Sequence, residues 1–246
     1  MKVLGIDIGG SGVKGAIVDT ELGELVSERH RIPTPHPAKP EAVAKTVQKV
    51  VQHFKWEGIM GCGFPAVVQH GIARTASNID KSWIDTNVEE LFSKLTKCKT
   101  HVLNDADAAG IAEMRCGGGK NKSGVVVMIT VGTGIGSGLF MDGMLYPNTE
   151  FGQFLLEGDI AEKYAADSVR KEKDLSWKKW GKRLNKYLNH LEMLVWPDLI
   201  IVGGGVSKKF EKFSKYLHIN AEIQPAQLKN EAGIIGAAIA ASEALA

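Results

Sequence analysis

Residues 5–19 read GIDIGGSGVKGAIVD, and residues 128–142, MITVGTGIGSGLFMD, repeat the same arrangement at a constant offset. In both copies an apolar run enters a turn of Gly, Ser or Thr, and a second alternating run leaves it. This pattern predicts a β-hairpin. A tip without bulky side chains lets backbone N–H groups approach a phosphate. We therefore expect two related half-molecules, each with a phosphate-binding turn. The predicted phosphate ligands are Gly9, Gly10, Ser11, Lys14, Thr130, Gly132, Thr133 and Gly134.

The composition is that of a globular protein that folds as one large domain or two lobes. The chain has 246 residues, of which 44% are hydrophobic and 24% charged. The net charge of +2 gives no argument for nucleic-acid binding, and no nucleic-acid motif is found. Three separated cysteines without a CxxC pair disfavour a zinc site and favour reduced thiols. No signal segment and no apolar run of membrane-spanning length is found, so we expect a cytoplasmic protein without membrane contact.

Basic residues are concentrated in the second half of the chain. They outnumber acids over residues 163–186, and Lys208, Lys209, Lys212 and Lys215 follow. One interpretation is a solvated helix face. The other is a track for an anionic polymer.

The predicted elements describe a duplicated α/β unit. Apolar runs predict strands at residues 2–8, 13–19, 24–32, 58–64, 99–104, 123–131, 135–141 and 199–202. Helical spacing predicts helices at residues 41–54, 105–115, from about 160, 177–196 and 231–245. We place one lobe at residues 1–105 and the other at 106–230, and we expect the helix within 231–246 to pack back onto the first lobe.

Asn104 and Asp105 lie where a predicted strand ends and a helix begins, which is where open α/β sheets bind ligands. The aspartate has the chemistry to accept a proton from a substrate hydroxyl, and the asparagine to bind an adjacent hydroxyl. The alternative is that Asp105 is an ordinary helix N-cap. Because phosphoryl transfer needs an acceptor hydroxyl beside the phosphate, the two turns favour the catalytic interpretation.

Two further motifs fit a phosphate site. Asp7 ends the first strand and is a candidate Mg²⁺ ligand, directly or through water. Gly203, Gly204 and Gly205 follow a buried strand and form a candidate nucleotide seat, or else a tight strand–helix packing point. Lys14 has its own alternative, a solvated strand lysine.

Asn78, Glu150 and Glu162 are the polar residues that we expect to face a sugar, because polyols need several fixed polar groups around them. The alternatives are a turn role for Asn78, solvent exposure for Glu150 and helix capping for Glu162.

The order of these motifs resembles the sugar-kinase, Hsp70 and actin superfamily. More narrowly, the chain is similar to the ROK family (repressor, open reading frame, kinase) and, within it, to the polyphosphate glucokinases, or polyphosphate/ATP-glucomannokinases. The matching stretches cover nearly the whole chain: DIGGSGVKGAIVD, GFPAVVQHGIARTASNIDKSWIDTN, LNDADAAG, TVGTGIGSGLF, PNTEFG, DLSW, LIIVGGGVSKK and NEAGIIGAA.

The resemblance implies an α/β fold of two RNase H-like lobes with a central cleft, and phosphoryl transfer from polyphosphate, with ATP as a possible second donor, to the 6-hydroxyl of glucose. By motif match Asp105 is the general base, and the sugar is surrounded by Asn78, Asn104, Asp105, Glu150 and Glu162. Gln153 replaces the family's sugar-facing histidine and cannot become cationic. A homodimer is expected by analogy. The alternatives are a nucleotide-dependent kinase for glucose, mannose or an amino sugar, and a non-catalytic sugar-binding relative.

Overall fold

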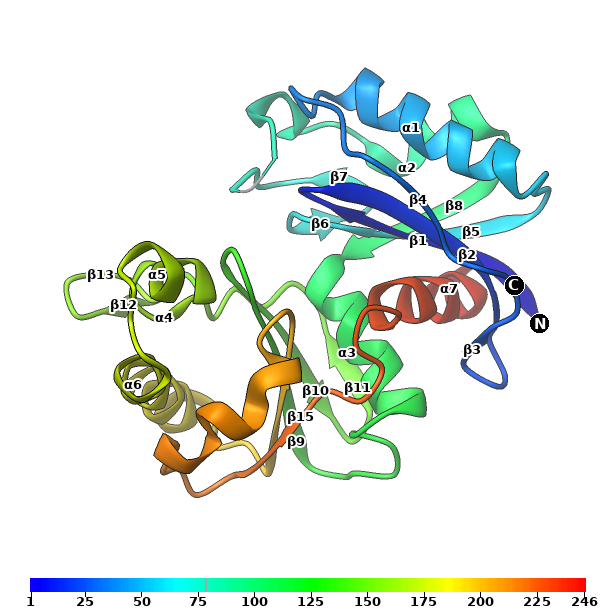
Figure 1. The fold of residues 1–246 in the computed structure, drawn as a ribbon. Coiled ribbons are helices and arrows are strands. Elements are labelled where there is room, and N and C mark those ends of the chain that lie inside the picture. Colours follow the sequence, from blue (N-terminus) through cyan, green and yellow to red (C-terminus); the bar gives the residue numbers. More distant parts are fainter. Residues whose placement is uncertain (78) are drawn as a thin grey trace. The chain divides into compact units, whose positions relative to one another are not determined.

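The computed structural model describes residues 1–77 and 79–246, and it divides the chain into two compact units (Figure 1). The first unit comprises Met1–Ala112 and Glu231–Ala246, and the second comprises Glu113–Asn230. Each contains its own mixed β-sheet. The prediction of two α/β lobes is therefore confirmed, and the cleft between them stays a prediction.

The sheet of the first unit has the order β3-β2-β1-β5-β8, with β4 pairing β2 as well. Strands β1 and β2 form the predicted antiparallel hairpin, whereas β1, β5 and β8 run parallel. The strands are β1 (Lys2–Gly9), β2 (Gly12–Asp19), β3 (Glu24–Leu25), β4 (His30–Ile32), β5 (Ile59–Phe64) and β8 (Lys99–Asn104), beside a small hairpin of β6 (Val68–Gln69) and β7 (Ile72–Ala73).

Helices cover both faces of this sheet (Figure 1). One face carries α1 (Pro40–His53) and α2 (Val88–Thr96), which contact each other, and η1 (Lys81–Trp83) precedes α2. The other face carries α7 (Ala232–Leu245), which packs on β1, β5 and β8. The α7 backbone lies directly against Gly5 and Gly61, where any side chain would collide with it. The expected return of the last helix to the first unit is thus what the structure shows.

The sheet of the second unit has the order β11-β10-β9-β14-β15. Here β9 and β10 form the second predicted hairpin, and β9, β14 and β15 run parallel. The strands are β9 (Val125–Val131), β10 (Ile135–Met141), β11 (Met144–Tyr146), β14 (Leu199–Gly203) and β15 (Glu222–Pro225), with a separate hairpin of β12 (Leu155–Leu156) and β13 (Asp159–Ile160). The helices are α4 (Glu162–Ala165), α5 (Asp167–Glu172), α6 (Trp177–Val195), η2 (Ser207–Lys212) and η3 (Ser214–Tyr216).

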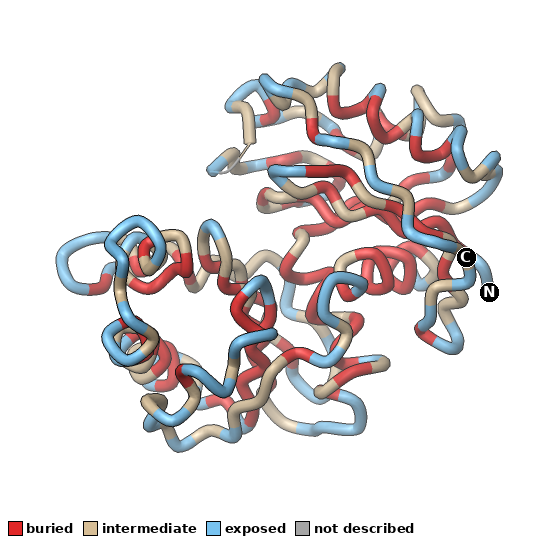
Figure 2. Tube along the Cα trace, viewed as in Figure 1, coloured by how far each residue is buried: buried red, intermediate tan, exposed pale blue. Residues whose placement is uncertain are grey.

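Burial is concentrated between the sheets and their helices (Figure 2). In the second unit α6 buries one apolar stripe, which includes Trp180, Leu184 and Leu188, against the core beneath β9 and β14. Its exposed face carries lysines such as Lys178 and Lys182. The amphipathic pattern that predicted this helix therefore reflects one buried and one solvated face.

Several element boundaries differ from those predicted. The predicted strand at 24–32 is two short strands, and the predicted helix from about 160 is two short helices broken at Ala166, whose backbone is extended. The units divide after Ala112 rather than at Asp105, because α3 (Asp105–Cys116) is continuous and its first turns lie against α7, with Gly236 on the Ala108 backbone.

Candidate functional site

The candidate site of the first unit lies at the carboxyl edge of its parallel strands. Asp7 on β1 pairs with Gly63 on β5, and Phe64 pairs with Asn104 on β8. The segments that follow these strands, namely the Gly9–Gly12 turn, Pro65 and Asp105, therefore start at one edge of the sheet. This is the edge at which α/β folds bind ligands.

The first turn is tightly held from one side and open on the other. Thr34 Oγ1 donates a hydrogen bond to the Gly9 carbonyl at 2.5 Å, and the Arg31 guanidinium donates to the Ser11 carbonyl at 2.5 Å. A side chain at Gly10 would meet nothing within 4 Å. The open face at Gly10 suits the approach of a phosphate to backbone N–H groups.

Asp7 and Lys14 form an ion pair, with Lys14 Nζ 2.7 Å from Asp7 Oδ2. Both side chains are largely buried, at 24% and 19% exposure for Lys14 and Asp7. The Asp7 carboxyl also faces the first turn of α7, where a side chain at Gly233 would come within 3.2 Å of it. Lys14 is thus paired with Asp7 and only partly exposed, and its contact with a phosphate stays a prediction.

Asn104 is the side chain that caps α3. Its Oδ1 accepts the N–H groups of Ala106 at 2.8 Å and Asp107 at 3.1 Å, and its Nδ2 donates to the Ala66 carbonyl at 3.1 Å. Asn104 is 7% exposed. Its hydrogen-bonding groups are thus engaged by the protein, and its first role is to fix the start of α3. The half-buried Asp105 follows at the first helical position.

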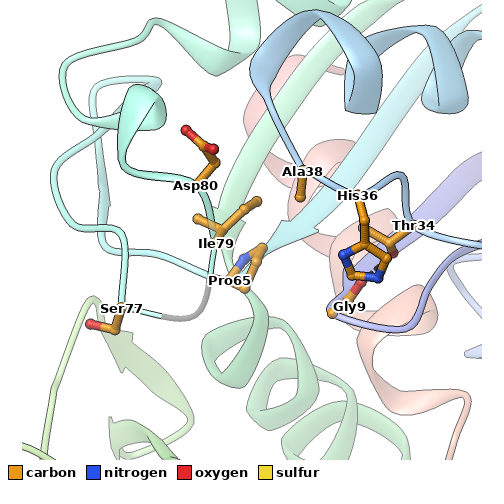
Figure 3. A pocket seen from close by; sticks show the side chains of 9 residues that line it. Gly9, Thr34, His36, Ala38, Pro65, Ser77, Ile79 and Asp80 are labelled. Carbon is orange, nitrogen blue, oxygen red and sulfur yellow. Dashed lines mark hydrogen bonds between the residues drawn. The ribbon is translucent and has the colours of Figure 1, made fainter.

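A pocket of about 280 Å³ lies beside the first turn (Figure 3). Gly9 and Gly10 line it on one side, together with Thr34 and His36. The opposite side is formed by residues next to the predicted sugar ligand Asn78, which itself lies outside the described residues. The remaining lining residues are Ala38, Pro65, Ser77, Ile79 and Asp80. The structure thus brings the predicted phosphate turn and the neighbours of Asn78, namely Ser77, Ile79 and Asp80, to one cavity.

In the second unit, too, the glycine-rich segments lie at the carboxyl edge of the parallel strands, but other residues hold them in place. Gly203 pairs with Thr130, so the glycine run 203–205 and the second turn begin at the same edge. Gly204 has a φ of 75° and packs against the Val131 backbone, which is the packing role left open above. Side chains at Gly132 and Gly205 would meet nothing within 4 Å, so these two glycines keep an open face.

Ser168, on α5, holds the second turn. Its N–H donates to the Gly132 carbonyl at 3.0 Å, and its Oγ donates to the Thr133 carbonyl at 2.6 Å. Nothing in the sequence pattern distinguishes Ser168 from any other serine, since its partners lie 35 residues away along the chain.

The predicted sugar residues of the second unit form one hydrogen-bonded group. Gln153 Nε2 donates to Glu162 Oε1 at 3.0 Å, and Glu162 Oε2 accepts the Ile135 N–H, directly after the second turn, at 3.1 Å. The Gln153 N–H donates to the Glu150 carbonyl at 2.9 Å. Burial, and then the charge of Glu162, raises the pKa of the Glu150 carboxyl. Glu162 therefore connects the sugar candidates to the second phosphate turn.

Several residues at the site were missed by sequence reasoning. Arg31, Thr34 and His36 surround the first turn, and Ser168 supports the second. The sequence gives one weak signal, because the run from Arg29 to Lys39 is rich in bases and prolines.

Over residues 1–77 and 79–246, no group of three or more His, Cys, Asp or Glu side chains is arranged to hold a metal ion. Within the same residues, no helix has the length and hydropathy that crossing a bilayer requires.

Comparisons with known proteins agree with this arrangement. The model of the ROK family matches residues 3–153. The polyphosphate glucokinase of Mycobacterium tuberculosis is 49% identical over 96% of this chain and 89% of its own length. That of Mycobacterium leprae is 46% identical over 97% of this chain and 74% of its own length.

The same chain is also similar to solved structures. The inorganic polyphosphate/ATP-glucomannokinase of Arthrobacter sp. strain KM superposes with a TM-score of 0.95 and 44% identity, covering 98% of both chains. A ROK family glucokinase from Streptomyces griseus, solved with glucose and AMPPNP, has a TM-score of 0.84 at 23% identity, covering 99% of this chain and 100% of its own.

Proposed function

The chain belongs to the ROK family, and we propose that it is a polyphosphate glucokinase. It transfers a phosphoryl group from inorganic polyphosphate, or from ATP, to the 6-hydroxyl of glucose and so yields glucose 6-phosphate. The observation that carries this proposal is the 49% identity to a polyphosphate glucokinase over 96% of this chain. The 44% identity to a polyphosphate/ATP-glucomannokinase supports the same activity and favours ATP as a second donor.

Asp105 is the general base of the proposed reaction. Because Asn104 accepts the N–H groups of Ala106 and Asp107, the helix start is fixed independently of the Asp105 carboxylate. That carboxylate takes the proton from the 6-hydroxyl as the oxygen attacks the terminal phosphorus. The bond to the bridging oxygen breaks, and the shortened polyphosphate or ADP leaves with the electron pair.

The two glycine turns bind the phosphates through backbone N–H groups. The open faces at Gly10 and Gly132 support this role, because a phosphate can reach the main chain there without meeting a side chain. The glycine at 205, also open, is the candidate contact for a nucleotide donor.

The sugar is bound by the polar residues predicted in each unit, which are Asn78, Asn104 and Asp105 in the first and Glu150, Gln153 and Glu162 in the second. In the second unit the Gln153 amide is oriented by its bond to Glu162, which leaves its carbonyl oxygen as an acceptor for a sugar hydroxyl. A histidine there is able to become cationic, whereas glutamine is not. The acceptor site of this chain is therefore expected to lose less affinity for neutral sugars at alkaline pH than a histidine-containing site.

Mg²⁺ fits the chemistry of the first turn as an ion that arrives with the phosphate donor. Asp7 supplies one carboxylate, and Mg²⁺ prefers one or two carboxylates together with phosphate oxygens and waters. When bound, Mg²⁺ neutralises charge that develops on the phosphoryl oxygens. Lys14 holds the Asp7 carboxylate at this edge through its 2.7 Å contact.

The basic region of the second unit supports the polyphosphate donor only in part. Four of its bases pair with acids, namely Lys163 with Asp159, Arg170 and Lys171 with Asp167, and Lys186 with Glu157. Lys173, Lys178, Lys179 and Lys182 form no such pair within the described ranges. These four lysines are the ones we assign to a polyanion track, whose binding weakens as salt rises.

A coupled assay for glucose 6-phosphate tests the proposal. Glucose is crossed against polyphosphate, ATP and GTP at equal concentrations of phosphoanhydride. We expect the highest kcat/KM with polyphosphate. A strong preference for ATP would make the chain a nucleotide-dependent kinase, and no turnover with any donor would leave a sugar-binding protein. Sedimentation of the purified protein tests the homodimer that we expect by analogy.

A further inference from the structure

The pocket beside the first turn is lined on one side by a segment for which the sequence analysis predicts no function. This segment, residues 31–38, runs from β4 to the start of α1, and we call it the strap. It contributes Thr34, His36 and Ala38 to the pocket, beside Gly9 and Gly10. Figure 3 shows the His36 imidazole on the same side of the pocket as Gly9, across from Ile79 and Ser77.

The strap is fixed at three points. Arg31 and Thr34 bond to the carbonyls of the first turn, each at 2.5 Å. At the other end the Ala38 carbonyl accepts the indole N–H of Trp83 at 2.8 Å, and Trp83 is fully buried. His36 lies between the second and third anchors, so its backbone is held in place at the rim of the pocket.

The His36 side chain has hydrogen-bonding capacity that the protein does not use. Within residues 1–77 and 79–246, its imidazole has no hydrogen-bond partner and no ion pair, and the residue is exposed. An imidazole offers at least one N–H donor in either protonation state. The other basic side chains at the turn are already engaged, Lys14 by Asp7 and Arg31 by the Ser11 carbonyl.

The charges around the pocket favour an anion near His36. The one carboxylate in the lining is Asp80, and hydrogen bonds from the hydroxyl and N–H of Ser82 lower its pKa. Figure 3 shows the Asp80 carboxylate on the far side and directed away from His36. An anionic group in this pocket is therefore repelled from the Asp80 side toward the glycine turn and the imidazole.

We infer that His36 binds a phosphoryl group seated against the Gly9–Gly10 backbone. The inference rests on the proposed function and adds to it a phosphate contact from outside the glycine turns. Two ligands carry the required chemistry, the donor polyphosphate and the product glucose 6-phosphate. His36 is a binding residue in this role and takes no part in proton transfer.

The test compares His36→Asn, whose side chain is too short to reach the ligand, with His36→Arg, which restores a long donor. His70→Asn is the matched control, because His70 is an exposed histidine of the same unit outside this pocket, and asparagine tolerates its φ of 52°. The KM for polyphosphate and the inhibition constant of glucose 6-phosphate are measured for each variant, together with the KM for glucose.

We expect His36→Asn to weaken the binding of one of the two phosphate ligands about fivefold to tenfold. This is the effect of losing a hydrogen bond to a charged group near solvent. The KM for glucose stays unchanged, and His36→Arg recovers most of the loss. An effect on the polyphosphate KM alone identifies the donor as the ligand. An effect on the inhibition constant alone identifies the product. If His36→Asn matches the wild type and His70→Asn in both constants, the inference is wrong.

Calorimetric titration with tripolyphosphate, in the absence of glucose, separates this inference from the proposed function. Weaker binding to His36→Asn than to His70→Asn supports the phosphate contact even if the wild type shows no glucokinase activity. Equal binding to both variants, combined with unchanged kinetic constants, overturns it.

Discussion

The two glycine turns are copies of one pattern, yet the chain supports them in different ways. The first turn is held by Thr34 and Arg31 of the strap, and the partly buried ion pair of Lys14 with Asp7 lies beside it. The second is held by one serine of α5 and by a carboxylate that accepts the N–H following the turn, through Ser168 and Glu162. Duplication has therefore kept the backbone of the hairpin and changed what surrounds it.

This difference indicates that the first turn acts mainly on phosphate charge, whereas the second also takes part in sugar binding. Charged groups lie at the first turn, where Asp7 pairs with Lys14 and Arg31 donates to the Ser11 carbonyl. At the second turn the carboxylate of Glu162 also orients Gln153, so support of the turn and recognition of the sugar share one side chain. The turns are alike in backbone but are expected to respond differently to mutation.

The two units differ most sharply at Asp105, because the strand that corresponds to β8 in the second unit, β15, is followed by Ala226 and not by a carboxylate. We expect Asp105→Asn to lower kcat by about 10²–10⁴-fold, since the acceptor hydroxyl loses its base. The coupled assay measures the loss. Asp85→Asn, an exposed carboxylate paired with Arg74, is the control. Near-normal turnover with an unchanged urea midpoint in Asp105→Asn would remove Asp105 from the mechanism.

Glu162 tests whether the second turn and the sugar residues act together. Glu162→Ala leaves both the Ile135 N–H and the Gln153 amide without their acceptor, and we expect a loss in kcat/KM for glucose of about 10- to 100-fold. Glu162→Gln keeps an acceptor for Ile135 and should lose less. Glu157→Ala, an exposed carboxylate that pairs with Lys186, is the control. Equal values for all three variants would show that the group is not coupled to catalysis.

A matched pair of hydroxyl deletions compares the turns directly. Thr34→Val removes a bond to the Gly9 carbonyl, and Ser168→Ala removes one to the Thr133 carbonyl. Each is expected to cost about 1 kcal/mol of turn stability and to raise the KM for the phosphate donor severalfold. The KM for polyphosphate and the KM for ATP are measured for each variant. Their comparison shows which turn matters more for each donor. A wild-type KM in both variants would mean that neither hydroxyl positions its turn.

The smallest expected effect concerns stability and pH. The pKa of Glu150 is raised above its ordinary value of 4.5, so the folded protein binds its proton more tightly than the unfolded chain does. Its contribution to the free energy of unfolding is therefore full below pH 4.5 and is lost as the pH rises through the raised pKa. Glu150→Gln should show a smaller decline in stability over this range than the wild type, measured by urea unfolding at several pH values. Parallel curves would contradict the shift.

Much of this architecture follows from local patterns in the sequence. The hairpins, the longer strands and the helix after Asn104 were predicted, because apolar periodicity and glycine turns determine them locally. The cap by Asn87 on α2, which accepts the Glu90 N–H, is likewise a local contact, between residues three apart. The third parallel strand of the second unit, β15, was missed, because its short run Glu222–Pro225 becomes a strand only by pairing with β14.

The site residues, too, were predicted where they belong to local motifs and missed where they depend on contacts between distant parts of the chain. Residues inside recognisable motifs, such as Asp7 and Gly132, were predicted as site candidates. Thr34 and Ser168 were missed, because both act through bonds to carbonyls that lie at least 25 residues away along the chain. Such bonds leave no periodic trace in a sequence. The exact ends of the predicted helix from about 160 were also wrong, because the extended backbone at Ala166 depends on tertiary packing.

The position of α7 has a consequence for biosynthesis. The sheet of the first unit emerges early from the ribosome, but the helix that covers one of its faces belongs to residues 232–245. Until those residues are translated, the apolar surface of β1, β5 and β8 around Gly5 and Gly61 has no covering helix. Nascent chains that hold the whole second unit should still expose this surface to chaperones, and its protection should coincide with the last stage of synthesis.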